Sequence, residues 1–300
     1  MSTPQIILLL VALIDLILGG LISNGFIVIA IIREWTKSRS LVSSEYLLLS
    51  LALSNIWGTV LITPFFINDY ITHVFISNCG LLIFYPLADF LIICRFWLTA
   101  WLCVFYCIKI VNSTHSLILW CKLRISWLLP RLLAGSLVVS LFIVFYMFYS
   151  ILRKLQCITK MNDTKITPEM LLDRTVNTPE VWFLTVGSST PLLVVMLCSI
   201  LVVASLCRHV CHMKGKELSS TSFQSKAHVK AAGTVLFLLF HYLSFYVVQT
   251  LCMTTRLGKT QGIIATIVVM VYPTAQAYVL MLVNSKLNQA VTQMLQRRET

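Results

Sequence analysis

The side chains best suited to chemistry in this sequence are a few ionisable groups that lie inside long apolar segments. Asp89, Arg95 and His241 each interrupt such a segment. A charged group at membrane depth is costly unless it faces other protein groups, and a buried imidazole needs a hydrogen-bond partner, so we expect these positions to be functional or hydrogen-bonded. Asp89 and Arg95 stand six residues apart, about 600° around a helix, so they point to different faces and cannot pair within it.

A second candidate is a cluster of residue types that could bind zinc: Cys207, His209, Cys211 and His212. On a helix, however, His209 points about 200° away from Cys207, so a tetrahedral site would require partial unwinding. The sequence also shows neither a nucleophile and base pattern nor the HExxH pattern of hydrolases. We therefore expect no metal, no cofactor and no catalytic residues, and we do not expect an enzyme.

The elements that must position these groups follow from composition. Of the 300 residues, 58% are hydrophobic and only 11% are charged, and the mean hydropathy is +0.87. These values indicate a polytopic membrane protein rather than a water-soluble domain. A helix needs about 20 apolar residues to cross about 30 Å of hydrocarbon. The segments that meet this length are residues 6–32, 46–67, 81–110, 127–152, 181–206, 229–253 and 262–283. We therefore predict an all-α bundle of seven transmembrane helices that forms a single domain over residues 1–300.

The distribution of Lys and Arg predicts the orientation of the bundle. With the C-terminus inside, fifteen Lys and Arg residues fall in cytosolic segments and seven in outer ones. The N-terminus is therefore expected outside. Residues 1–5 contain no Lys or Arg and the first segment is too long for a signal-peptide core, so we expect an uncleaved first helix. The net charge of +12 then lies mainly on the inner face, where anionic lipids explain it more simply than nucleic acid does.

Motifs on the predicted inner side resemble those of one receptor family. They include Asn24-Gly25-Phe26-Ile27, Phe96-Trp97, Val104-Phe105-Tyr106, the run from Lys226 to Ala231, and Asn284-Ser285-Lys286-Leu287. In these places the chain resembles the type 2 taste receptors, which are bitter taste receptors with seven helices that couple to G proteins. The resemblance extends over the whole chain and is weakest in the outer halves of the helices, as in a divergent member.

The resemblance implies a bundle of the G-protein-coupled receptor type in the plasma membrane. Small bitter compounds would bind from the extracellular side, and a heterotrimeric G protein with a gustducin or Gi-like α subunit would bind from the cytosol. Membrane lipids are further expected partners, and nucleic acid is not.

The resemblance also implies which residues line the ligand pocket. The expected set is Phe66, Tyr85, Ala88, Asp89, Ile92, Phe183, Gly187, His241, Thr266 and Val269. Many relatives have Trp and Asn in place of Ala88 and Ile92, so we expect a larger pocket without that aromatic wall. Asp89 is expected either to favour cationic ligands or to be merely solvated at the helix mouth. His241 is either a core residue bonded to a neighbour or the group that couples ligand binding to movement of the sixth helix.

The second segment departs from the family pattern, which has an Arg after Leu-Ala-x-Ser where this chain has Asn55. Arg95 in the third segment lies at the depth that faces this part of the second helix in seven-helix receptors. We hypothesise that the buried cation has moved from the second helix to the third and hydrogen-bonds Asn55, since it must face the bundle interior.

The basic inner ends of the helices would flank a cleft for the C-terminal helix of a Gα subunit. The expected contacts are Tyr106, Lys109, Ile110, His115, Arg208, His228, Lys230 and Lys286. Residues 287–295 show an amphipathic pattern and are expected to form a short helix on the inner leaflet.

Two glycosylation sequons provide a test of the orientation. Asn162 lies in the longest outer loop and is expected to carry a glycan, whereas Asn112 is predicted to be cytosolic and to stay bare. Cys79 and Cys157 reach the oxidising side, so a disulfide between them is geometrically conceivable, although bitter receptors generally lack that bridge.

Two other classes remain as alternatives. A vomeronasal type 1 pheromone receptor shares the short N-terminus and the overall plan. A small-solute membrane transporter would show paired interrupted helices from an internal repeat, and none is visible in the sequence.

Overall fold

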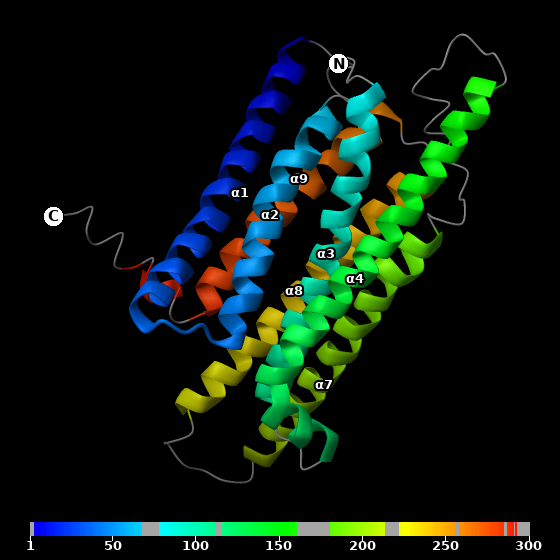
Figure 1. Cartoon of the computed structure of the whole chain (residues 1–300). Helices are drawn as coiled ribbons and strands as arrows, with labels where there is room; N and C mark the ends of the chain where they lie inside the picture. The colour runs from blue at the N-terminus through cyan, green and yellow to red at the C-terminus, as the bar shows by residue number, and fades with distance from the viewer. Residues whose placement is uncertain are drawn as a thin grey trace.

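The computed structural model of the chain is a bundle of long helices (Figure 1). It describes residues 3–67, 78–111, 116–160, 181–213, 222–255, 258–284, 287–290 and 292. The helices are α1 (Thr3–Ser38), α2 (Ser43–Ile67), α3 (Asn78–Ile110), α4 (Ser116–Lys160), α7 (Thr190–Met213), α8 (Ser222–Thr254) and α9 (Lys259–Val283). A π-helical segment, η2 (Phe183–Ser189), runs directly into α7.

Seven helical spans of the described chain are long and apolar enough to cross a membrane. This confirms the predicted fold class. Helices suit this environment because each one satisfies its backbone hydrogen bonds within the segment, where no water is present to do so. α1 begins at the end of the bundle opposite to the end where α9 finishes, as an odd number of crossings requires (Figure 1).

The helices extend beyond the apolar segments that the sequence marks. α4, for example, begins at Ser116 and ends at Lys160, whereas the apolar segment covers residues 127–152. Charged residues such as Lys122 and Arg124 interrupt the hydrophobic pattern but are good helix formers, so the helix continues through them toward water. α3 also begins before its apolar segment, at Asn78 rather than residue 81.

α3 is the central helix of the bundle. It packs against α2, α4, α7 and α8, while α9 packs against α1, α2 and α8. The largest fully buried side chains include Arg95 and Phe96 of α3, Tyr242 and Phe245 of α8, and Tyr272 of α9. The core around α3 therefore contains a charged group and hydroxyls as well as apolar residues.

Candidate functional site

Four helices meet in a buried group of amides and a hydroxyl, which we call the central cluster: Asn24, Asn55, Thr99 and Gln276. Asn24 of α1 donates a hydrogen bond from Nδ2 to the carbonyl oxygen of Pro273 of α9 at 3.1 Å. Asn55 of α2 donates to Oδ1 of Asn24 and to Oε1 of Gln276, both at 3.1 Å. Gln276 of α9 donates from Nε2 to the Thr99 hydroxyl of α3 at 3.1 Å. The cluster therefore ties α1, α2, α3 and α9 together.

Arg95 extends from α3 to the backbone of α2. Its side chain is only 1% exposed. Nε and Nη2 donate to the carbonyl oxygen of Ser54, and Nη2 also donates to that of Asn55, each at 3.4 Å. A Cβ atom on Gly58 would overlap the guanidinium, so glycine is what lets Arg95 lie against α2. The prediction that Arg95 faces α2 is confirmed, but its partners are backbone carbonyls, because the Asn55 amide donates within the central cluster.

His241 joins α8 to α9. Its Nε2 lies 2.9 Å from the carbonyl oxygen of Tyr272, and since a carbonyl only accepts, Nε2 carries the proton. The imidazole stacks on the rings of Phe237 and Tyr272, with centroids 5.3 and 4.4 Å away. The Tyr272 hydroxyl lies 3.4 Å from the Thr99 hydroxyl and accepts a bond from Gln276 at 3.5 Å. His241 is therefore connected to the central cluster through one residue.

The π-helical segment η2 makes the second set of contacts with α8. The Ser188 carbonyl accepts a hydrogen bond of 2.9 Å from the Tyr242 hydroxyl. The hydroxyls of Ser189 and Tyr246 also lie 2.9 Å apart. Pro191 follows closely and has no N–H to donate to the preceding turn, which favours the wider hydrogen-bonding pattern of a π turn. The sequence predicted an uninterrupted span here, and the Ser-Ser-Thr-Pro run was the signal that could have located the turn.

The predicted ligand residues lie on α2, α3, η2, α8 and α9. The side chains of Ala88, Asp89, Ile92, Phe183 and Val269 are buried, as is Gly187, and His241 is partly buried. Asp89 is 4% exposed, so it is not solvated at a helix mouth in this structure. A Cβ on Gly187 would lie 3.2 Å from Cγ1 of Ile93, so this glycine allows η2 to pack closely on α3. The side chains of Phe66, Tyr85 and Thr266 lie outside the described residues.

The predicted G-protein contacts are described only in part. Lys109 is exposed with its ammonium 4.5 Å from the Phe105 ring centroid, Arg208 is exposed, Tyr106 is half-buried and Ile110 is buried. Outside the described part of the chain are His115, Lys286 and the side chains of His228 and Lys230, as well as Asn162 and Asn112 and the side chains of Cys79 and Cys157. The described contacts lie on α3 and α7, at the end of the bundle where α9 finishes.

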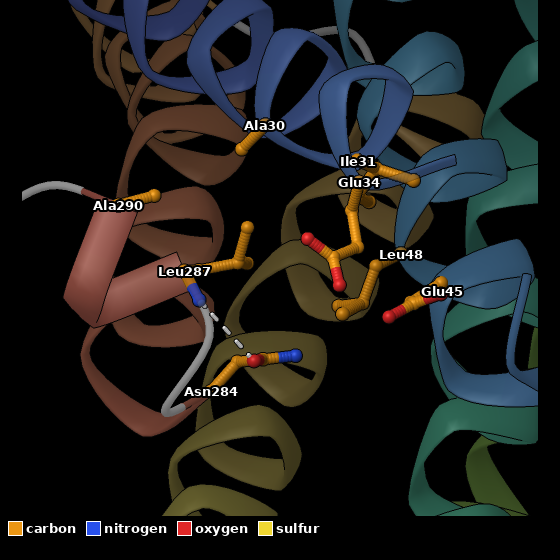
Figure 2. A pocket seen from close by; sticks show the side chains of 8 residues that line it. All are labelled: Ala30, Ile31, Glu34, Glu45, Leu48, Asn284, Leu287 and Ala290. Atoms are coloured by element: carbon orange, nitrogen blue, oxygen red, sulfur yellow. Dashed lines mark hydrogen bonds between the residues drawn. The ribbon is translucent and has the colours of Figure 1, made fainter. Parts of the chain in front are cut away.

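A cavity of about 70 Å³ lies at this same end, between α1, α2 and the segment after α9 (Figure 2). Glu34 of α1 and Glu45 of α2 line it, and Glu45 also accepts a hydrogen bond from the Val42 N–H at 2.9 Å. Leu287 is buried on the opposite wall, where its N–H donates to Oδ1 of Asn284 at 3.4 Å. Counting Lys and Arg alone predicted a basic inner face, so the sequence argument missed this pair of carboxylates.

The arrangement of the helices matches a known receptor architecture. Squid rhodopsin superposes on the chain with a TM-score of 0.66, covering 100% of this chain and 88% of that one at 12% sequence identity. With the seven spans and the buried contacts between them, this likeness defines a seven-helix membrane bundle with the fold of the G-protein-coupled receptor type.

The sequence comparisons identify the family to which the chain belongs. The family profile described as "Taste receptor protein (TAS2R)" matches residues 1–299. Taste receptor type 2 member 8 of Pongo pygmaeus is 28% identical over 295 residues, covering 92% of this chain and 91% of the relative. Taste receptor type 2 member 9 of Macaca mulatta is 30% identical over 293 residues, covering 92% and 89%. The chain therefore belongs to the taste receptor type 2 family and is a bitter taste receptor, and the alternatives of a pheromone receptor or a transporter are not favoured.

Proposed function

We propose that small bitter compounds bind on the outer side of the central cluster, between α3, η2, α8 and α9, and that a heterotrimeric G protein binds at the opposite end. The observation that carries this proposal is the link from His241 to the central cluster through Tyr272. A ligand that contacts α3 and α8 would change the balance between two positions of α8, because it binds one of them better. Movement of α8 would then widen the inner cleft for the C-terminal helix of Gα.

The ligand pocket in this proposal uses the residues that the sequence singled out. Ala88, Asp89, Ile92, Phe183 and Val269 would contact the ligand directly, and His241 would transmit its binding to α9. Because Asp89 is almost fully buried, its carboxylate would favour ligands that carry an amine, which could hydrogen-bond it in a site with little water. The G protein would contact Lys109 and Arg208, with a gustducin or Gi-like α subunit as the expected partner.

The orientation in this proposal has the N-terminus outside the plasma membrane and the C-terminus in the cytosol. A glycan on Asn162 is expected from it, and Asn112 would face the cytosol. Asn162→Gln should remove the mass that peptide N-glycosidase releases, whereas Asn112→Gln should leave it unchanged. The reverse result would invert the orientation.

A calcium-mobilisation assay tests the function directly. Cells that express the receptor with a chimeric Gα subunit should respond to at least one member of a panel of bitter compounds, and cells with the Gα chimera alone should not. Asp89→Asn should weaken responses to amine-bearing agonists more than responses to neutral ones. A response that persists when Gα is absent would contradict the proposed coupling.

A further inference from the structure

The outward face of α1 carries a carboxylate among apolar side chains. Asp15 is exposed and shares this face with Val11, Leu18 and Ile22, which are 50%, 49% and 70% exposed. α1 lies at the edge of the bundle, where it packs against α2 and α9 (Figure 1). Among the residues that the structure describes, the Asp15 carboxylate makes no hydrogen bond or ion pair with another group.

A contact with α9 shows how deep in the bundle Asp15 lies. The Thr274 hydroxyl of α9 donates to the carbonyl oxygen of Leu16 at 3.2 Å, so Asp15 lies within about one helical turn of the level of Thr274. Thr274 is about 22 Å from the start of α9 at Lys259 and about 14 Å from its end at Val283. Asp15 therefore lies near the middle of the membrane, whichever end of the bundle faces the cytosol.

A carboxylate that faces hydrocarbon at this depth is costly. Intramembrane acids almost always face the bundle interior or a water-filled cavity, where they pair with other polar groups. Asp15 does not face the interior: Asn24, which joins the central cluster, stands nine residues further on, about 900° around the helix, and so lies on the opposite face of α1. The outward face of α1 therefore lacks the polar group that would complement Asp15.

A second copy of this chain would not supply the complementary charge. In the described spans, the basic residue in the middle of the bundle is Arg95, which is 1% exposed and donates to α2. The exposed Arg131 of α4 lies at a different level, because its neighbour Pro130 lines a cavity together with Val42, in the connection between α1 and α2. A complementary cation would therefore come from a different protein.

We propose that the face of α1 around Asp15 binds a transmembrane helix of another protein, one that carries a Lys or Arg near the middle of its span. Such a cation is also costly in hydrocarbon, so pairing it with Asp15 offsets both costs at once. Ala12, about one turn before Asp15, is exposed, and Gly19, about one turn after it, is partly exposed. These small residues allow a second helix to approach the carboxylate closely.

The test uses the full-length receptor in cells together with a designed single-span helix of Leu and Ala residues. One version of this helix carries Lys at its centre, and the reference version carries Leu there. Resonance energy transfer between a luciferase on the receptor and a fluorescent protein on the helix measures their association at matched surface amounts. The Lys helix should associate about threefold or more tightly than the Leu helix, as expected for one polar contact in a membrane.

Variants of the receptor trace this preference to Asp15. Asp15→Leu should reduce association of the Lys helix to that of the Leu helix. This change places a good helix former and an apolar side chain at a lipid-facing position, so the receptor should remain folded and at the cell surface. Ile22→Ala is the matched control, because it trims the same face without changing a charge and should leave the ratio between the two helices unchanged.

The outcomes are distinguishable from each other and from failure of the proposed function. Equal association of the two helices with the wild-type receptor, or a preference for the Lys helix that survives Asp15→Leu, would overturn the proposal. Energy transfer between receptor copies that Asp15→Leu abolishes, without a preference for the Lys helix, would also overturn it and assign this face to a second copy. Calcium responses to bitter compounds report on the receptor function separately, because the association measurements need neither agonist nor G protein.

Discussion

The central cluster and the contacts of α8 hold the bundle together in different ways. In the cluster, amides from α1, α2 and α9 and a hydroxyl from α3 bond to one another in a continuous chain. α8 is held by separate contacts: His241 bonds to α9, and Tyr242 and Tyr246 bond to η2. Phe96 of α3 also packs against aromatic rings of α8.

The difference indicates which part of the receptor is fixed and which part moves. Breaking one bond of the cluster leaves buried amide groups unsatisfied, which costs more than the bond itself is worth. The α8 contacts can be broken one at a time, and the aromatic rings can slide without losing all of their contact area. We therefore expect α1, α2, α3 and α9 to act as a frame against which α8 changes position.

The largest expected effect comes from the contact of Arg95 with α2. Gly58→Ala places a methyl group where the buried guanidinium lies, so it should destabilise the receptor by about 1–3 kcal/mol through overpacking. Thermal unfolding in detergent measures this change. Gly135→Ala on α4 is the matched control, since a Cβ there meets no atom within 4 Å.

The Gly58 result can be traced to Arg95 by a double-mutant cycle. Arg95→Leu should make Gly58→Ala nearly harmless, because the atoms that the methyl group meets are then absent. If Gly58→Ala proves as stable as Gly135→Ala, Arg95 does not pack against α2 as described.

A smaller loss is expected within the central cluster. Asn55→Leu removes two donated hydrogen bonds and leaves Oδ1 of Asn24 and Oε1 of Gln276 without that donor, so we expect about 1–2 kcal/mol of destabilisation. Thr250→Val on α8 is a useful contrast, because the Thr250 hydroxyl is buried without a hydrogen-bond partner in the described chain. That change should be neutral or stabilising, and equal losses at the two positions would remove the distinction between frame and α8.

The smallest expected change in stability belongs to His241. His241→Phe keeps the stacked ring but removes one hydrogen bond to α9, which is worth about 0.6 kcal/mol in a membrane protein. If that bond restrains α8, its loss should raise ligand-independent signalling about threefold. The calcium assay without agonist checks this, with Phe240→Leu at an exposed neighbouring position as control. Unchanged basal signalling would show that His241 is a packing residue only.

Much of the fold was predictable because hydrophobicity along about 20 residues decides which segments cross a membrane. The placement of Arg95 toward α2 was also predictable, since a buried charge must face protein and, in seven-helix receptors generally, this depth of the third helix faces the second. The role of Gln276 was missed, although the sequence showed it beside Pro273, because nothing in the local pattern indicates which helix its amide will face. Glu34 and Glu45 were missed for a related reason, as they lie on different helices and line the same cavity only in the folded bundle.

The sequence by itself determined the class, the number of spans and the family, because composition, hydrophobic segments and motifs are properties of the chain read in order. Only the tertiary structure decided that Arg95 bonds to backbone carbonyls across Gly58, that η2 forms a π turn against Tyr242, and that His241 lies against Tyr272. These contacts depend on the depth and rotation of each helix relative to its neighbours. Such quantities are set by packing across the bundle and not by any one segment.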